Sequence, residues 1–72
     1  MPSNRTVPLA LLKLPRVLER TGLSRTELYR LVREQRFPRP VKLGMRGNAW
    51  PAHEIQTWIA DRMAERDARA AA

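Results

Sequence analysis

The feature that most constrains this chain is the glycine-containing turn Gly22-Leu23-Ser24, which separates two short amphipathic segments. Glycine adopts positive φ angles at little cost, so Gly22 predicts the end of one helix. Ser24 followed three residues later by Glu27 matches a capping box, which predicts the start of the next helix. A helix, a short turn and a second helix together predict a helix-turn-helix.

The second of these helices, Ser24 to Arg33, has an apolar stripe and a basic outer face. Leu28, Leu31 and Val32 recur at the spacing of a helix that packs against a core. The side opposite this stripe carries Thr26, Arg30 and Arg33, with Arg25 and Tyr29 on its flank. We interpret this segment as a DNA recognition helix. The alternative is an ordinary solvated surface helix that carries arginines on its outer side.

The charge of the chain favours the DNA-binding interpretation. Fourteen Lys and Arg residues against seven Asp and Glu residues give a net charge of +7. Seven of these cations but only two acidic residues lie between Ser24 and Trp50. A basic patch concentrated in one region is typical of a protein that binds a polyanion. Twelve of the cations are arginine, which binds phosphate or guanine through two parallel hydrogen bonds.

The segment after the recognition helix predicts a small β-hairpin, or wing. Prolines in Phe37-Pro38-Arg39-Pro40 push the preceding residues into extended conformations and end the helix. Val41–Leu43 alternates like a strand, residues 44–48 contain two turn glycines, and Ala49-Trp50 is the expected partner strand. Such a wing places Arg46 at its tip, with Lys42 behind it, against the minor groove or the DNA backbone. The alternative is a plain surface hairpin.

The first helix is expected at 15–21, after a short strand within residues 9–14. Pro15 suits the first helical position, Val17 and Leu18 face inward, and Arg16 and Arg20 face outward.

A third helix is expected from Pro51, and its inward face follows a helical spacing. That face consists of Ile55, Trp58, Ile59 and Met63. Phe37 and Trp50 are expected in the core with Trp58. The predicted fold is thus mainly α with a small β-hairpin, a winged helix-turn-helix of three helices plus a wing. We expect a flexible N-terminal lead at 1–10, the DNA-binding domain at 11–66 and a frayed C-terminal tail at 67–72.

Several function classes are disfavoured by the residues present. The chain has no cysteine and one histidine, so neither a disulfide nor a zinc site is expected. We expect no cofactor and no enzyme activity, because no nucleophile, base and orienting group occur in a recognisable pattern. The longest apolar run, residues 7–12, is too short to span a membrane and contains Pro8. A cytoplasmic, nucleoid-associated protein without a small-molecule effector is the expectation.

Several short motifs occur together between Leu11 and about Arg62. They are Leu11-Leu12-Lys13-Leu14-Pro15, Thr21-Gly22-Leu23-Ser24-Arg25, Tyr29-Arg30-Leu31, Phe37-Pro38-Arg39-Pro40-Val41-Lys42-Leu43-Gly44, and Trp50 followed by Glu54-Ile55 and Trp58. This combination resembles the AlpA-like family of phage and prophage regulators. The resemblance implies a winged helix-turn-helix related to MerR-type regulators and phage excisionases, and a role in transcription or in site-specific recombination by an integrase.

Carried over by position, the resemblance assigns DNA contacts in the recognition helix and in the wing. The recognition-helix positions are Ser24, Arg25, Thr26, Tyr29, Arg30 and Arg33, and the wing positions are Lys42 and Arg46. The chain departs from the family pattern at Glu27, where a small hydroxyl residue is common, and at Pro51 and His53 before the last helix.

Our leading hypothesis is a sequence-specific double-stranded DNA-binding protein, a small phage or prophage transcriptional regulator. Arg25, Thr26, Arg30 or Arg33 would reach base edges, and Tyr29 with Arg16 or Arg20 would contact phosphates. One alternative is an excisionase-like directionality factor that bends DNA and contacts an integrase. Another class is a protein-interaction adaptor or anti-repressor, and a third is non-specific nucleic-acid or RNA binding. RNA polymerase or an integrase are candidate protein partners, and tight binding by so small a domain would need cooperative neighbours or a weak homo-oligomer.

Overall fold

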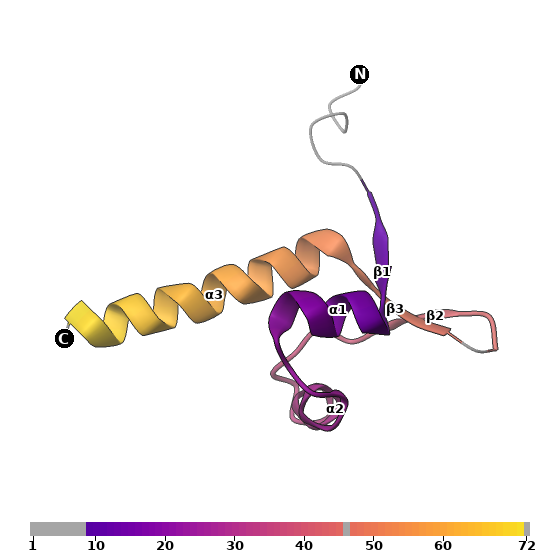
Figure 1. Cartoon of the computed structure of the whole chain (residues 1–72), viewed down its shortest axis with the longest axis horizontal. Coiled ribbons are helices and arrows are strands. Elements are labelled where there is room, and N and C mark those ends of the chain that lie inside the picture. The colour runs from indigo at the N-terminus through magenta and orange to yellow at the C-terminus, as the bar shows by residue number, and fades with distance from the viewer. Residues whose placement is uncertain (1–8, 46, 72) are drawn as a thin grey trace, which may run out of the picture.

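The computed structural model describes residues 9–45 and 47–71 of the chain. In that part, three helices accompany a small three-stranded antiparallel sheet, and α3 extends away from it (Figure 1). The elements are β1 (Leu11–Lys13), α1 (Leu14–Thr21), α2 (Arg25–Arg33), β2 (Val41–Leu43), β3 (Gly47–Pro51) and α3 (Ala52–Ala71). The fold is the expected winged helix-turn-helix, mainly helical, with β2 and β3 as the wing. Residues 1–8 of the expected N-terminal lead lie outside the described residues.

The sheet is built around β3, which pairs with β2 on one side and with β1 on the other. In the register, Trp50 lies opposite Leu12, and Asn48 lies opposite Lys42. The return strand is therefore longer than the expected Ala49-Trp50, because Gly47 and Asn48 also pair with β2. A strand was expected near β1, but no local pattern of residues indicated that this strand completes the same sheet as the wing.

The turn between α1 and α2 has the predicted glycine cap and an additional side-chain contact. Gly22 has a φ of 77°, and its N–H donates to the carbonyl of Leu18 at 2.8 Å. The Thr21 hydroxyl donates to the carbonyl of Val17 at 2.9 Å and accepts from the N–H of Leu23 at 3.3 Å. In Figure 1, α1 runs across the view while α2 is seen end-on, so the two helices cross steeply after this turn.

The start of α2 confirms the predicted capping box. The Glu27 N–H donates to the Ser24 hydroxyl at 3.1 Å, and the Ser24 N–H donates to Glu27 Oε1 at 3.1 Å. These two bonds satisfy backbone donors that a helix N-terminus otherwise leaves without a partner.

The end of α2 has an unusual residue in a left-handed conformation. Gln35 has a φ of 60° and is the one non-glycine residue with a positive φ in the described part of the chain. Its N–H donates to the carbonyl of Val32 at 3.0 Å, and the Arg36 N–H donates to the carbonyl of Leu31 at 2.8 Å. This pair of bonds is a Schellman motif, in which glycine is the usual left-handed residue.

The hydrophobic core has Trp50 at its centre. The indole ring is fully buried and meets the rings of Phe37 and Tyr29 at centroid distances of 6.3 Å each. Its Nε1–H donates to the carbonyl of Pro38 at 2.8 Å, so the polar atom of the buried ring is satisfied. The buried core residues are Leu14, Val17, Leu28, Phe37, Trp50 and Ile55. The expected core positions of Phe37 and Trp50 are confirmed.

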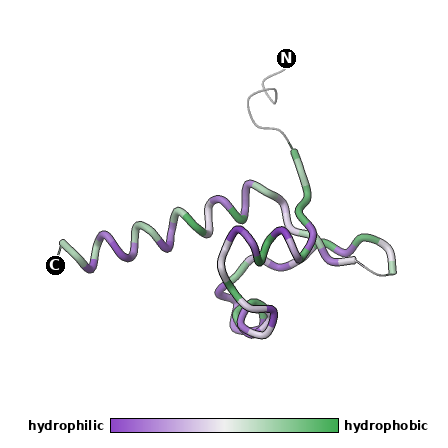
Figure 2. The backbone as a smooth tube through the Cα atoms, in the orientation of Figure 1, coloured by the Kyte–Doolittle hydropathy of each residue, from purple (hydrophilic) through white to green (hydrophobic). Residues whose placement is uncertain are grey.

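Helix α3 begins against the core and then extends away from it (Figure 1). Ile55 is buried, and Trp58 and Ile59 are partly buried against the core. Met63 was expected on the same inward face, but this prediction is wrong, because its side chain is 49% exposed. Among the described residues no other element covers the extended part of α3, along which hydrophobic and hydrophilic residues continue to alternate (Figure 2).

The start and the end of α3 can be compared with the helix and tail boundaries expected from the sequence. Pro51 is the last residue of β3, and the helix begins one residue later at Ala52. At the other end, the helix runs on to Ala71. The division of the chain at residue 66 into a domain and a frayed tail stays a prediction.

We predict that Gln35→Gly raises the free energy of unfolding by about 0.5–1 kcal/mol, because glycine removes the Cβ clash of the left-handed conformation. Urea denaturation followed by circular dichroism measures this change. Gln35→Ala is the matched control, since alanine keeps the Cβ atom and should give no comparable gain. Equal stabilities for the glycine and alanine variants would contradict a strained residue at the end of α2.

Candidate nucleic-acid interface

The outer face of α2 presents the cationic side chains that the sequence placed there. Arg25 and Thr26 occupy the first turn of the helix, and Arg30 and Arg33 follow toward its end, all of them exposed. Ser24, the N-cap, is also exposed, although its hydroxyl already accepts the capping bond from Glu27. The helix thus carries three exposed arginines within its nine residues.

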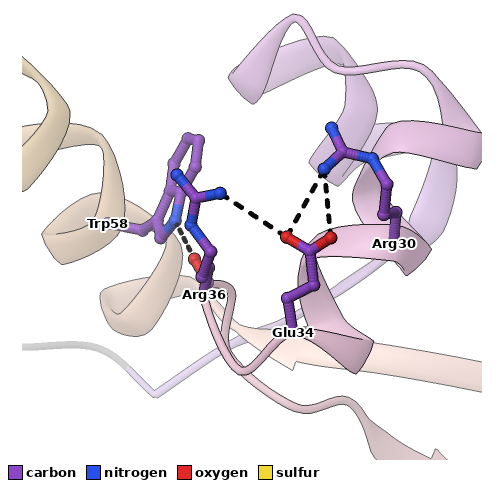
Figure 3. A network of polar contacts seen from close by, with 4 residues as sticks. All are labelled: Arg30, Glu34, Arg36 and Trp58. Atoms are coloured by element: carbon purple, nitrogen blue, oxygen red, sulfur yellow. Dashed lines mark hydrogen bonds and ion pairs between the residues drawn. The ribbon is translucent and has the colours of Figure 1, made fainter.

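Arg30 forms an ion pair with Glu34 on this face. Its Nη1 lies 3.3 Å and 3.4 Å from the two carboxylate oxygens of Glu34, and the same carboxylate accepts from Arg36 Nη1 at 3.5 Å (Figure 3). The Arg30 and Glu34 side chains are 47% and 42% exposed. An ion pair at this exposure contributes only a few tenths of a kcal/mol, on the order of 0.2–1. Arg30 can therefore exchange Glu34 for another anion at little cost.

Tyr29 lies at the edge of the basic face and is half-buried. Its ring packs against Trp50 at a centroid distance of 6.3 Å, and its hydroxyl accepts a hydrogen bond from Asn48 Nδ2 at 3.1 Å. Asn48 belongs to β3, so this contact joins α2 to the wing. Asn48 was expected in the turn of the hairpin, and no role was predicted for its side chain.

The wing itself is formed by β2 and β3, joined across residues 44–46. Lys42 is exposed in the middle of β2. Val41, Leu43 and Met45 are exposed as well, at 41%, 38% and 98%. Arg46, expected at the tip, lies outside the described residues.

Two more predicted contact residues lie on α1. Arg16 and Arg20 are both exposed, and Arg16 Nε lies 3.6 Å from a carboxylate oxygen of Glu19. They belong to a different helix from the basic face of α2, and their contact with phosphates stays a prediction. The predicted site therefore comes from α1, α2 and the wing, three elements that the core around Trp50 brings together.

The segment that follows α2 is attached to α3 by Trp58. The indole Nε1–H donates to the carbonyl of Arg36 at 2.9 Å (Figure 3). The Phe37 ring lies 5.0 Å from the Trp58 ring, and the guanidinium of Arg62 lies 5.0 Å from the same ring. These contacts within the protein occupy Trp58, which agrees with its predicted structural role over base stacking.

Across residues 9–45 and 47–71, no group of three or more His, Cys, Asp or Glu side chains is arranged to hold a metal ion. No helix in the same part of the chain has the length and apolar character needed to cross a membrane.

Comparison with known proteins identifies the family. The family described as prophage CP4-57 regulatory protein (AlpA) matches residues 10–63, which include β1, the helix-turn-helix, the wing and the core-packed half of α3. The chain belongs to the AlpA family. This AlpA-family chain is 42% identical over 55 residues to an uncharacterized protein, ORF88, of Enterobacteria phage P4. The alignment covers 76% of the chain and 62% of the phage protein, so less than two thirds of that relative is represented. No solved structure matches the chain significantly.

We predict that Tyr29→Phe and Asn48→Ala each lower the free energy of unfolding by about 0.5–1.5 kcal/mol, because each removes the hydrogen bond between α2 and β3. The double variant should lose less than the sum of the two single losses, because both remove the same bond. Thermal and urea denaturation of the four proteins measure this coupling. Fully additive losses would show that the two side chains do not interact.

Proposed function

We propose that this AlpA-family chain is a sequence-specific double-stranded DNA-binding protein that acts as a small phage or prophage transcriptional regulator. The observation that carries the proposal is the exposed basic face of α2 beside a wing, in a chain with a net charge of +7. Membership of a family named for a prophage regulatory protein supports the same conclusion.

In the proposed complex, α2 enters the major groove of the DNA. Arg25, Arg30 and Arg33 have the length and the paired donors to bind guanine, and each such contact contributes about 1–3 kcal/mol of discrimination against other bases. Thr26 can contact a thymine methyl group or a base edge from the first turn of the helix. Arg30 leaves Glu34 when it binds, which costs little at this exposure.

Other residues are proposed to bind the DNA backbone on both sides of the groove. Arg16 and Arg20 on α1 and the Tyr29 hydroxyl are assigned to phosphates, and such contacts position the protein without reading sequence. Lys42 and Arg46 are assigned to the flanking backbone or minor groove through the wing.

The test of this function is selection of bound duplexes from a randomised DNA pool at physiological salt. Enrichment of one motif supports the proposal, and the spacing of repeated half-sites shows whether copies bind in tandem or about a two-fold axis. Recovery of unenriched DNA would contradict it and favour the adaptor or anti-repressor class. If a motif is enriched, bending of the bound DNA with capture of an integrase would favour the excisionase-like alternative, and recruitment or exclusion of RNA polymerase would favour the regulator.

We predict that Arg30→Ala abolishes preference for the selected motif and leaves weak, non-specific binding, because the guanidinium that reads a base is lost. Affinities for the selected and a scrambled duplex measure the effect. Arg69→Ala removes the same charge from the exposed end of α3 and should keep the preference. An equal loss on both duplexes would move Arg30 to the residues that bind phosphate.

We predict that Lys42→Ala and Arg46→Ala each reduce the slope of log affinity against log salt by about 0.9, the value for one phosphate contact. Affinities measured over a series of salt concentrations give this slope. An unchanged slope in both variants would remove the wing from the DNA interface.

A further inference from the structure

The hydrogen bond between Asn48 and Tyr29 joins the two parts of the molecule that the proposed function places on DNA. Asn48 Nδ2 donates to the Tyr29 hydroxyl oxygen at 3.1 Å, and the two residues are 19 positions apart in the sequence. One belongs to β3 in the wing and the other to the recognition helix α2.

The direction of this bond decides whether the Tyr29 hydroxyl can still donate a hydrogen bond. A tyrosine hydroxyl has one proton to donate and lone pairs that accept. The amide of Asn48 occupies a lone pair and leaves the proton, for which the described residues provide no acceptor within hydrogen-bonding distance. The hydroxyl is thus left as a donor, and a DNA phosphate oxygen is an acceptor that strengthens such a bond through its charge.

The position of the hydroxyl is fixed by its neighbours. The Tyr29 ring packs against Trp50, which is buried and bonded to the carbonyl of Pro38. Asn48 lies on the central strand β3, where it pairs with Lys42 of β2 and is followed at once by residues that pair with β1. A donor held in this way loses little conformational entropy when it binds.

The register of the wing places a cation beside Asn48, the residue that holds this donor. Lys42 on β2 is directly opposite Asn48, and side chains of directly opposed residues in an antiparallel pair share one face of the sheet. The exposed ammonium group of Lys42 therefore lies on the same face as the amide that holds Tyr29.

We propose that Asn48 is the positioning residue of a phosphate clamp whose two donors are the Tyr29 hydroxyl on α2 and the Lys42 ammonium group on β2. The inference rests on the proposed DNA binding and adds that one phosphate is bound jointly by the recognition helix and the wing. The clamp fixes how the wing sits on the backbone when α2 lies in the major groove.

The experiment uses the full chain and a duplex carrying the selected motif, in which each phosphate in turn is replaced by a neutral methylphosphonate. For the wild-type protein, one replacement beside the wing should lower affinity about tenfold, as expected for loss of a bond to a charged group. Tyr29→Phe and Lys42→Ala should each weaken binding to the unmodified duplex and reduce the sensitivity at that same phosphate. Asn48→Ala should also reduce the sensitivity at that phosphate. Adding Tyr29→Phe to Asn48→Ala should then change the affinity very little.

The slope of log affinity against log salt distinguishes the loss of a donor to phosphate from a change in the structure of the wing. Tyr29→Phe removes a neutral donor and should leave the salt slope unchanged, whereas Lys42→Ala should lower it by about 0.9. A salt slope lowered by Tyr29→Phe would mean that the wing had moved, and would overturn the clamp. Asn48→Ser replaces Asn48→Ala if the alanine variant does not fold, and Gln56→Ala, on the exposed side of α3, is the control for an unrelated polar change.

The remaining outcomes are distinguishable. Wild-type protein that binds every duplex equally weakly overturns both the proposed function and the clamp. In a second outcome, the wild-type protein binds the motif, and Asn48→Ala and Asn48→Ser keep the full loss of affinity at the critical phosphate, a loss that still depends on Tyr29. This outcome overturns the role of Asn48 alone.

Discussion

The burial of Trp50 is the packing interaction on which the rest of the structure depends. From the middle of the sheet, its indole reaches the ring of Tyr29 on α2, the ring of Phe37 beyond α2 and the carbonyl of Pro38. A chain of this length buries only about 60% of the surface that its unfolded form exposes. A single large aromatic side chain is therefore an important part of the core, and its contacts hold the wing against α2.

The central strand β3 connects this core to the surface of the molecule. Asn48 and Trp50 are two residues apart in the strand, so their side chains lie on the same face of the sheet. Tyr29 contacts both of them. The face that β3 turns toward α2 thus changes from apolar and buried at Trp50 to polar and half-buried at Asn48, and the candidate interface begins where the core ends.

The sequence predicted the features that depend on residues close together in the chain, and it missed those that depend on distant ones. Gly22 and the pair Ser24 and Glu27 define the helix-turn-helix within a few residues, and the structure confirms both caps. The pairing of β1 with β3 and the bond from Asn48 to Tyr29 join distant segments, for which no local pattern exists. Periodicity gave the correct face of α3 but not the point where the core ends, which is why Met63 was misplaced. The DNA contacts remain predictions.

The pairing of β1 with β3 also has a consequence for the order in which the protein folds. The strand Leu11–Lys13 can pair only after residues 49–51 are present, whereas the turn between α1 and α2 is held by contacts between residues a few positions apart in the sequence. Local contacts form faster than those that close long loops. During synthesis, α1 and α2 can therefore form early, but they gain their core only after Trp50 has left the ribosome. The position of α2 is thus fixed by a strand that is made after it.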